Sequence, residues 1–191
     1  MDMQGSRVLN ATQEQTWQAL NDPDILKACI PGCDKFELAE PNVYAVVVAL
    51  KIGPVAAKFT GKVSLMDIVP PNSYALQFEA QGGIAGFGKG ESKVELKPVE
   101  GGIELSYTVH SQVGGKIAQL GQRLIDGVAK TLAEDFFTRF EEQLIARHGV
   151  SNAQEASSSS QDNAEASGST PTWIWAFALM IAASAVWFIS K

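Results

Sequence analysis

Hydrophobic and polar residues alternate over several stretches of this chain. Between Val55 and Leu65 every second residue is apolar or glycine, while lysine, threonine and serine occupy most of the positions between them. The same period of two recurs over residues 74–81, 93–97 and 103–109. This pattern predicts antiparallel strands with one face on a core and the other in water. The turn sequences VPPNS and PVEGG separate these runs and favour sequential hairpins.

The segments before these strands predict shorter elements. GSRVLN is typical of a short first strand, and Thr12 is placed to cap a helix over QEQTWQALND. The next segment, DPDILKACIPGC, predicts a second helix that ends at Pro31 and Gly32. The run YAVVVALKI is apolar on both faces, so its pattern does not assign the inner side of the strand around Val46 to Leu50.

The last part of this region changes to a helical period. Apolar residues recur every three to four positions, which predicts one long helix packed on one curved sheet. Gly121 and Gly127 fall in its first half, and two helical glycines indicate either tight packing on the sheet or space left open beneath. The apolar positions are Ile117, Leu120, Leu124, Val128, Leu132, Phe136, Phe140 and Leu144.

Three motifs resemble the family of the carbon monoxide dehydrogenase subunit CoxG: IPGC at 30–33, KIGPVAAKFTGKVSL at 51–65, and VGGKIAQLGQRLIDGVAKTLAEDFFTRF at 113–140. That family belongs to the START-like (SRPBCC) superfamily of hydrophobic-ligand binders. The resemblance implies an α+β helix-grip fold, in which a curved antiparallel sheet surrounds a long C-terminal helix. It also implies association with aerobic carbon monoxide dehydrogenase, a molybdenum and flavin enzyme, and recruitment of that enzyme to the membrane. It does not name a ligand.

Composition divides the chain into three predicted parts. Residues 1–148 form the START-like ligand-binding domain, and the Ser- and Ala-rich stretch 149–171 is typical of a flexible linker. Residues 172–190 are apolar and flanked by tryptophans, which predicts a single transmembrane helix. Because the N-terminus lacks the pattern of a signal peptide, we expect the domain on the cytoplasmic face of the inner membrane, held by this C-terminal anchor.

Charge and chemistry exclude several function classes. The formal net charge of −6 argues against binding nucleic acid and against a polybasic grip on anionic lipid. The glycine-rich GGIAGFGKGES precedes a strand instead of a helix, unlike a dinucleotide-binding loop. Cys29 and Cys33 have only two distant histidines to complete a metal site, and no nucleophile is paired with a base. We therefore expect a non-enzymatic protein without a metal or covalent cofactor.

Two roles remain open. In the first, the domain carries a respiratory quinone, menaquinone or ubiquinone, between the membrane and the dehydrogenase, because an enzyme that oxidises carbon monoxide must pass electrons to an acceptor that stays in lipid. In the second, it is a docking module or maturation factor for the dehydrogenase without a ligand. A cavity between sheet and helix distinguishes the two roles.

The carrier hypothesis selects specific residues. Tyr107 is the candidate that donates a hydrogen bond to the quinone head group. Lys116 and Arg123 are candidates for contact with the dehydrogenase. The predicted ligand-binding residues are Phe59, Val63, Phe78, Leu105 and Tyr107 on the sheet, with Leu120, Gly121, Leu124 and Ile125 beneath the helix.

Overall fold

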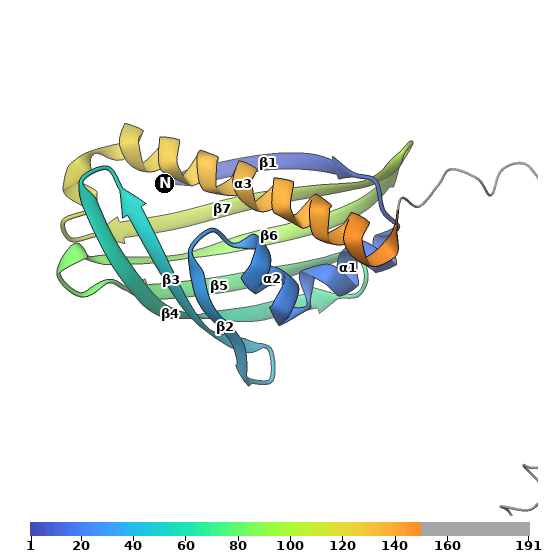
Figure 1. Cartoon of the computed structure of the whole chain (residues 1–191), viewed down its shortest axis with the longest axis horizontal. Helices are drawn as coiled ribbons and strands as arrows, with labels where there is room; N and C mark the ends of the chain where they lie inside the picture. Colours follow the sequence, from blue (N-terminus) through green and yellow to red (C-terminus); the bar gives the residue numbers. More distant parts are fainter. Residues whose placement is uncertain (150–191) are drawn as a thin grey trace, which may run out of the picture. The chain divides into compact units, whose positions relative to one another are not determined.

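A computed structural model describes residues 1–149 of the chain. Three α-helices, seven β-strands and two short 3₁₀ turns make up this region (Figure 1). In chain order they are β1 (Asp2–Leu9), α1 (Gln13–Leu20), α2 (Pro23–Cys29), β2 (Cys33–Glu40), β3 (Val43–Ile52), β4 (Val55–Val69), β5 (Ser73–Gln81), η1 (Gly83–Ala85), β6 (Phe87–Val99), β7 (Gly102–Gly114), η2 (Ala118–Leu120) and α3 (Gln122–His148).

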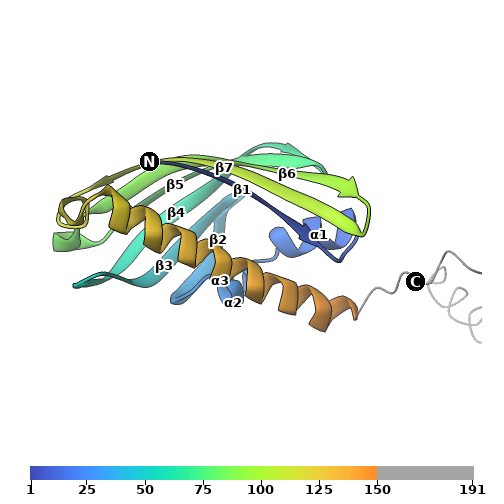
Figure 2. The ribbon, with the colours of Figure 1, turned by 90° about the horizontal axis from the view of Figure 1, so that it is seen from above.

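The seven strands form one antiparallel sheet in the order β1-β7-β6-β5-β4-β3-β2. Strands β2 to β7 follow one another as hairpins, as the turn sequences predicted, and β1 joins the outer edge of β7. The sheet is curved, and α3 lies across its concave side (Figure 2). This arrangement confirms the predicted helix-grip architecture of a curved antiparallel sheet around a long helix.

Alternation assigns each strand an inner face. In β3, which the sequence left unassigned, Tyr44, Val46, Val48 and Leu50 face inward, because these residues line the space beneath α3. Their neighbours occupy the opposite face and are also apolar, which is why the sequence pattern alone could not distinguish the two sides.

The long helix begins later than predicted. Gly121 has a backbone φ of 88°, a conformation that other residues rarely adopt, and α3 starts only at Gln122. Ile117 and Leu120 therefore belong to the η2 segment and not to the helix. The change matters for the site because residues 117–121 do not extend the helix face that lies over the sheet.

The two halves of α3 pack differently. The C-terminal half buries Phe137, Phe140 and Leu144 in the main core, with Phe140 completely enclosed, whereas the N-terminal half buries only Ile125. Arg7 on β1 reinforces the packed half, since its Nε lies 2.7 Å from Glu141 Oε1. The helix is thus fixed at one end of the sheet and leaves space beneath the other.

Helices α1 and α2 complete the core at the packed end. Thr12 caps α1 as predicted, in a capping box with Gln15. Asp22 caps α2 through the backbone N–H groups of Asp24 and Ile25. The same Asp22 carboxylate accepts a hydrogen bond from Arg147 at 2.7 Å, which ties the end of α3 to the α1–α2 junction.

One part of the predicted fold class is corrected. The sequence predicted a transmembrane helix, but no helix within residues 1–149 is long and apolar enough to cross a membrane. Helix α3 has the length, yet charged residues such as Arg123, Lys130 and Glu134 recur at nearly every turn. The predicted span, 172–190, lies outside the described residues, as does the predicted linker beyond Gly149. The fold class of the described region is the helix-grip domain alone.

Stability should depend on the packed half of α3. We expect Phe140→Ala to lower the free energy of unfolding by about 3–5 kcal/mol, because it opens a cavity in a fully enclosed core. Ile145→Ala on the same helix is the matched control, since Ile145 is 51% exposed and should lose less than about 1 kcal/mol. Chemical denaturation of the full chain measures both, and equal losses would contradict this account of the core.

Candidate functional site

Two adjoining cavities lie between the concave face of the sheet and α3. The larger, here called the apolar chamber, has a volume of about 540 Å³ and extends beneath the N-terminal half of the helix. The smaller, called the tyrosine chamber, has about 330 Å³ and lies deeper, toward the packed core. Val63, Phe78 and Phe136 line both, so the chambers share a boundary. Their sizes fall in the range of small-molecule sites.

Small residues on facing elements keep the apolar chamber open. The sheet contributes Gly61, Ala80 and Gly88, and the helix contributes Ala129 and Ala133. A methyl group placed on Gly88 would meet no atom within 4 Å, so this strand position borders empty space. Larger residues at Ala80, Gly88, Ala129 and Ala133 would fill the interior, as they do in an ordinary core. A Cβ on Gly61 would instead collide with the carbonyl oxygen of Glu79 on the neighbouring strand.

Glycine has a second role on β6, where it makes room for an aromatic ring. A Cβ on Gly90 would lie 2.8 Å from Cζ of Phe78, which is closer than real contacts allow. The Phe78 ring therefore lies over the strand and forms part of the boundary between the chambers. The missing side chain at Gly90 therefore provides space that the Phe78 ring occupies.

The tyrosine chamber gathers all three tyrosines of the chain: Tyr44, Tyr74 and Tyr107. Burial raises the pKa of each of the three phenols above its ordinary value, and hydrogen bonding contributes nothing to these shifts. They therefore stay protonated at neutral pH. The other lining residues are largely apolar, among them Leu76, Leu105 and Phe137. The chamber combines an apolar wall with three tyrosine side chains, of which Tyr107 extends its hydroxyl over Gly5 of β1.

The structure places six of the nine predicted ligand-binding residues in the lining. Phe59 and Ile125 line the apolar chamber, Leu105 and Tyr107 line the tyrosine chamber, and the other two, Val63 and Phe78, line both. Contact of any of them with a ligand stays a prediction.

The remaining three predicted residues, Leu120, Gly121 and Leu124, lie outside both linings. Gly121 follows η2 and is exposed, so the open space that a Cβ there would face is solvent and not either chamber. Leu124 is 39% exposed and lies beside Gly53. The late start of α3 explains these differences. Lys116 and Arg123, the predicted partner-binding residues, are exposed in this same region.

Sequence reasoning predicted only Ile125 on the helix side of the site. Ala129, Leu132, Ala133 and Phe136 line the cavities together with Ile125, and their spacing of four, three, one and three residues is that of a single helix face. This spacing was available in the sequence. The predicted register instead centred the face on Leu120 and Leu124, where the helix had not yet begun or was only starting.

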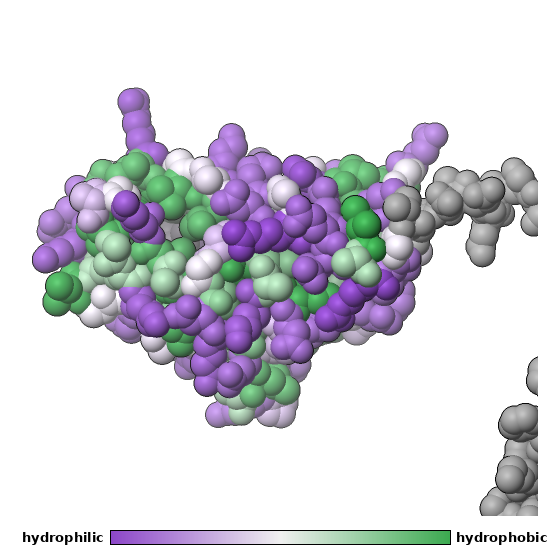
Figure 3. All heavy atoms as spheres, in the orientation of Figure 1, coloured by the Kyte–Doolittle hydropathy of each residue, from purple (hydrophilic) through white to green (hydrophobic). Residues whose placement is uncertain are grey.

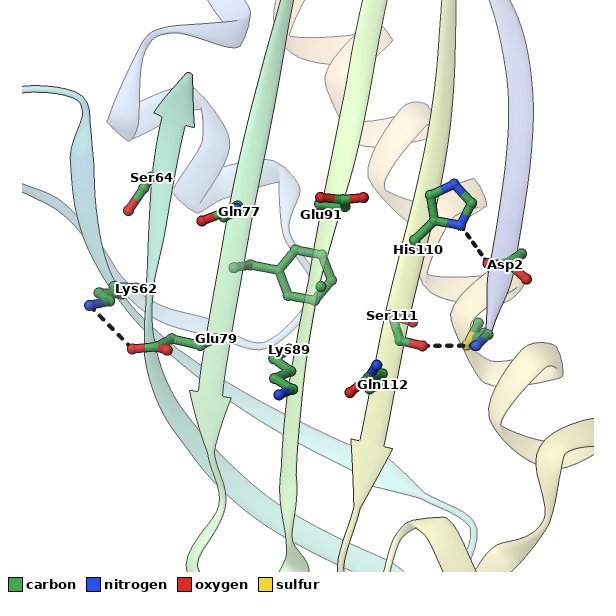
Figure 4. A pocket seen from close by; sticks show the side chains of 13 residues that line it. Asp2, Lys62, Ser64, Gln77, Glu79, Lys89, Glu91, His110, Ser111 and Gln112 are labelled. Carbon is green, nitrogen blue, oxygen red and sulfur yellow. Dashed lines mark hydrogen bonds and ion pairs between the residues drawn. The ribbon is translucent and has the colours of Figure 1, made fainter. Parts of the chain in front are cut away.

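A third hollow, of about 630 Å³, lies on the other face of the sheet and is polar (Figure 4). Side chains of β4, β5, β6 and β7 point into it, and some of them contact one another (Figure 4). Lys62 lies 3.3 Å from Glu79, and His110 contacts Asp2. These side chains are largely exposed, as expected on the wet face of a sheet. The hollow therefore adds no ligand site to the two interior chambers.

The two cysteines show no sign of reactivity. Cys29 is completely buried, and burial raises the pKa of its thiol to about 11. Burial also raises the pKa of Cys33, whose Sγ donates to the carbonyl oxygen of Lys35 at 3.2 Å. Within residues 1–149 no three metal-ligating side chains come together.

Comparison with known proteins agrees with the fold and adds a family. The model of the family described as the carbon monoxide dehydrogenase subunit CoxG matches residues 5–145. No curated protein matches the chain. A conserved protein from Geobacillus kaustophilus is 36% identical, with a TM-score of 0.73, and the match covers 78% of this chain and 97% of that one.

More distant structures share the fold only. A protein from Thermus thermophilus is 14% identical with a TM-score of 0.59, over 78% of this chain and 99% of the other. A protein from Mycobacterium smegmatis is 16% identical with a TM-score of 0.57, over 77% and 92%. At this identity the likeness concerns architecture and carries no statement about ligands.

The thiol chemistry gives a direct test. A pKa of about 11 leaves about one Cys29 thiol in a thousand ionised at pH 8, and the side chain is enclosed as well. We therefore expect iodoacetamide to leave Cys29 unmodified in the native protein and to modify it fully in urea, as read by peptide mass spectrometry. Modification should rise as the pH approaches 11. Rapid native alkylation at pH 8 would contradict the burial described here.

Proposed function

This chain belongs to the CoxG family of carbon monoxide dehydrogenase subunits, and we propose that it binds a respiratory quinone in the joined chambers and carries it between a membrane and carbon monoxide dehydrogenase. The cytoplasmic face of the inner membrane, predicted from the sequence, is part of this proposal. The family name supports the partner. The observation that supports the ligand is the pair of adjoining cavities, one apolar and one lined by three tyrosines.

The two chambers match the two parts of such a ligand. An isoprenoid tail needs only apolar contact, which Leu50, Phe59 and Ile125 provide in the apolar chamber. A quinone head has two carbonyl oxygens that accept hydrogen bonds, and phenols are suitable donors. In this orientation the head enters the tyrosine chamber and the tail extends beneath the N-terminal half of α3.

The energetics suit a carrier and not a tight binder. Burying a tail contributes about 0.8 kcal/mol per CH₂ relative to water, but a bilayer provides nearly the same. The chamber therefore has only to match the membrane, and the phenol hydrogen bonds add about 0.5–1.5 kcal/mol each. Exchange in both directions stays reversible under these conditions, which is what repeated delivery of oxidised quinone and return of quinol requires.

A docking or maturation role without a ligand is the alternative. The exposed side chains of Lys116 and Arg123 are compatible with a protein partner, and the family name is compatible with an accessory role. Docking alone gives no reason for small residues at Ala80, Gly88, Ala129 and Ala133. The two roles are compatible, and filling the cavity distinguishes them.

Filling the apolar chamber should block quinone loading. We expect Gly88→Leu to reduce uptake of a long-chain quinone at least about tenfold, because the added side chain occupies the space that a Cβ at this position faces. The fold should persist, since Gly88 lies in a strand with φ outside the left-handed region. Extraction of the purified full chain and mass spectrometry measure the bound quinone.

Gly127→Leu is the matched control for this substitution. It adds the same side chain on the exposed side of α3, where a Cβ would also meet nothing within 4 Å. Loading should stay normal in this variant. If Gly88→Leu loads as well as Gly127→Leu and supports respiration on carbon monoxide equally, the docking role is the better account.

The phenols should affect head-group binding specifically. We expect Tyr74→Phe and Tyr107→Phe each to weaken binding about two- to tenfold, through the loss of one hydrogen bond. Because the pKa values are raised, affinity should stay constant between about pH 6 and 9. Titration with a quinone and with the same tail lacking carbonyl groups separates the effects: only the quinone should respond. An equal response of both ligands would place the head elsewhere.

A further inference from the structure

Three chain segments meet at one end of the domain, here called the loop end. They are residues 51–58, 81–90 and 112–125, which hold the β3–β4 turn, the β5–β6 turn and the link from β7 to α3. The backbone N–H of Ile117 donates to Ala85 O at 3.0 Å, and both side chains belong to one buried cluster with Phe59. The loop end is therefore one packed surface.

Large apolar side chains are exposed on this surface. Ile84 is 84% exposed, Phe87 38% and Leu124 39%, from two of the three segments of the loop end. Hydrophobic residues gather at the left of the view in Figure 3, where the β3–β4 turn and the start of α3 lie in Figure 1. Single exposed apolar residues are common, but a cluster of them marks an interaction surface.

The charged residues of the three segments are all basic. The three segments contain Lys51, Lys58, Lys89, Lys116 and Arg123 and no acidic residue. Lys58 pairs with Asp34 at 2.6 Å, whereas the other four form no ion pair within residues 1–149. The nearest acidic residue along α3 is Asp126, which already accepts a hydrogen bond from Gln122.

The opposite end of the domain is acidic. Asp22 and Asp24 begin α2, Asp67 precedes the β4–β5 turn, and Glu100 lies in the β6–β7 turn. In an antiparallel sheet these turns lie at the end away from the loop end. The net charge of −6 therefore does not show that basic residues lie at the loop end and acidic residues at the opposite end of the domain.

We propose that the loop end docks on an anionic lipid bilayer, with Ile84, Phe87 and Leu124 entering the interface and Lys51, Lys89, Lys116 and Arg123 facing the head groups. Apolar residues within a ring of cations are the combination that such a surface binds. The apolar chamber lies directly behind, since Ile52, Ile117 and Ile125 of the same segments line it. This inference concerns the partner surface and holds whichever apolar ligand the chamber takes. It assigns Lys116 and Arg123 to lipid, in place of the dehydrogenase.

A fluorescent label at position 84 tests the proposal. In the full chain with Cys33→Ser, the variant Ile84→Cys is labelled with the environment-sensitive dye NBD, and Val69→Cys is the matched control. Val69 is 52% exposed but lies at the acidic end. With vesicles of phosphatidylcholine and about 30% phosphatidylglycerol, the label at position 84 should shift to the blue and resist iodide quenching. The label at position 69 should not change.

The charge requirement is measured in the same assay. Adding Lys51→Gln and Lys116→Gln should weaken vesicle binding of the position 84 label about thirtyfold, at about 1 kcal/mol per cation. Since the label reports its own surroundings, any contact of residues 150–191 with the vesicle does not contribute. Quinone loading is measured separately, by extraction and mass spectrometry, so its failure and the failure of docking are distinguishable.

Three outcomes would overturn the proposal. The first is no change at position 84 with any vesicle, and the second is an equal change with and without phosphatidylglycerol. The third is protection of position 84 by purified carbon monoxide dehydrogenase, or by a second copy of the chain, but not by vesicles. That result would assign the loop end to a protein partner.

Discussion

The structure depends on the unequal packing of one helix. Phe137, Phe140 and Leu144 fix the C-terminal half of α3 in the main core, and Arg7 and Asp22 hold that half to β1 and to the α1–α2 junction. The burial of these side chains supplies the cohesion that the N-terminal half lacks. A helix packed along its whole length would leave no cavity, and an unpacked one would not stay on the sheet. The cavity exists because one half of α3 is packed on the sheet and the other half is not.

Much of the fold could be predicted from sequence, for identifiable reasons. Strands β4 to β7 have one face in water, so their apolar and polar residues alternate along the sequence. This period of two predicted the strands and the sheet-side lining residues Phe59 and Val63. β3 is apolar on both faces and gave no such signal. The predicted start of α3 was wrong because the positive φ of Gly121 ends the helix there, although the apolar residues continue at a helical spacing on both sides. The spacing of apolar residues contains no information about a single backbone angle. The helix-side residues were displaced as a result.

Charge shows a different limit of reasoning from composition. A net value describes the field far from the molecule, whereas a bilayer or a protein meets one surface of it. Four cations on the loop end have no ion pair in the described region, although acidic residues outnumber basic ones over the chain. The net charge argued against a polybasic grip on anionic lipid, whereas the distribution of charge supports the docking proposed above. Lys51, Lys89 and Lys116 are far apart in the sequence, and the folded hairpins bring their segments to the same end of the domain. A short stretch of sequence therefore does not reveal this group of cations.

The separation of the two halves of α3 has an evolutionary consequence. Substitutions at Gly88, Ala129 or Ala133 change the volume and shape of the chamber without touching the side chains that determine stability. Ligand preference can therefore drift over generations while the fold tolerates each step. A lineage that acquires a different lipid-soluble molecule needs no new scaffold, only a different set of small residues along one strand and one helix face.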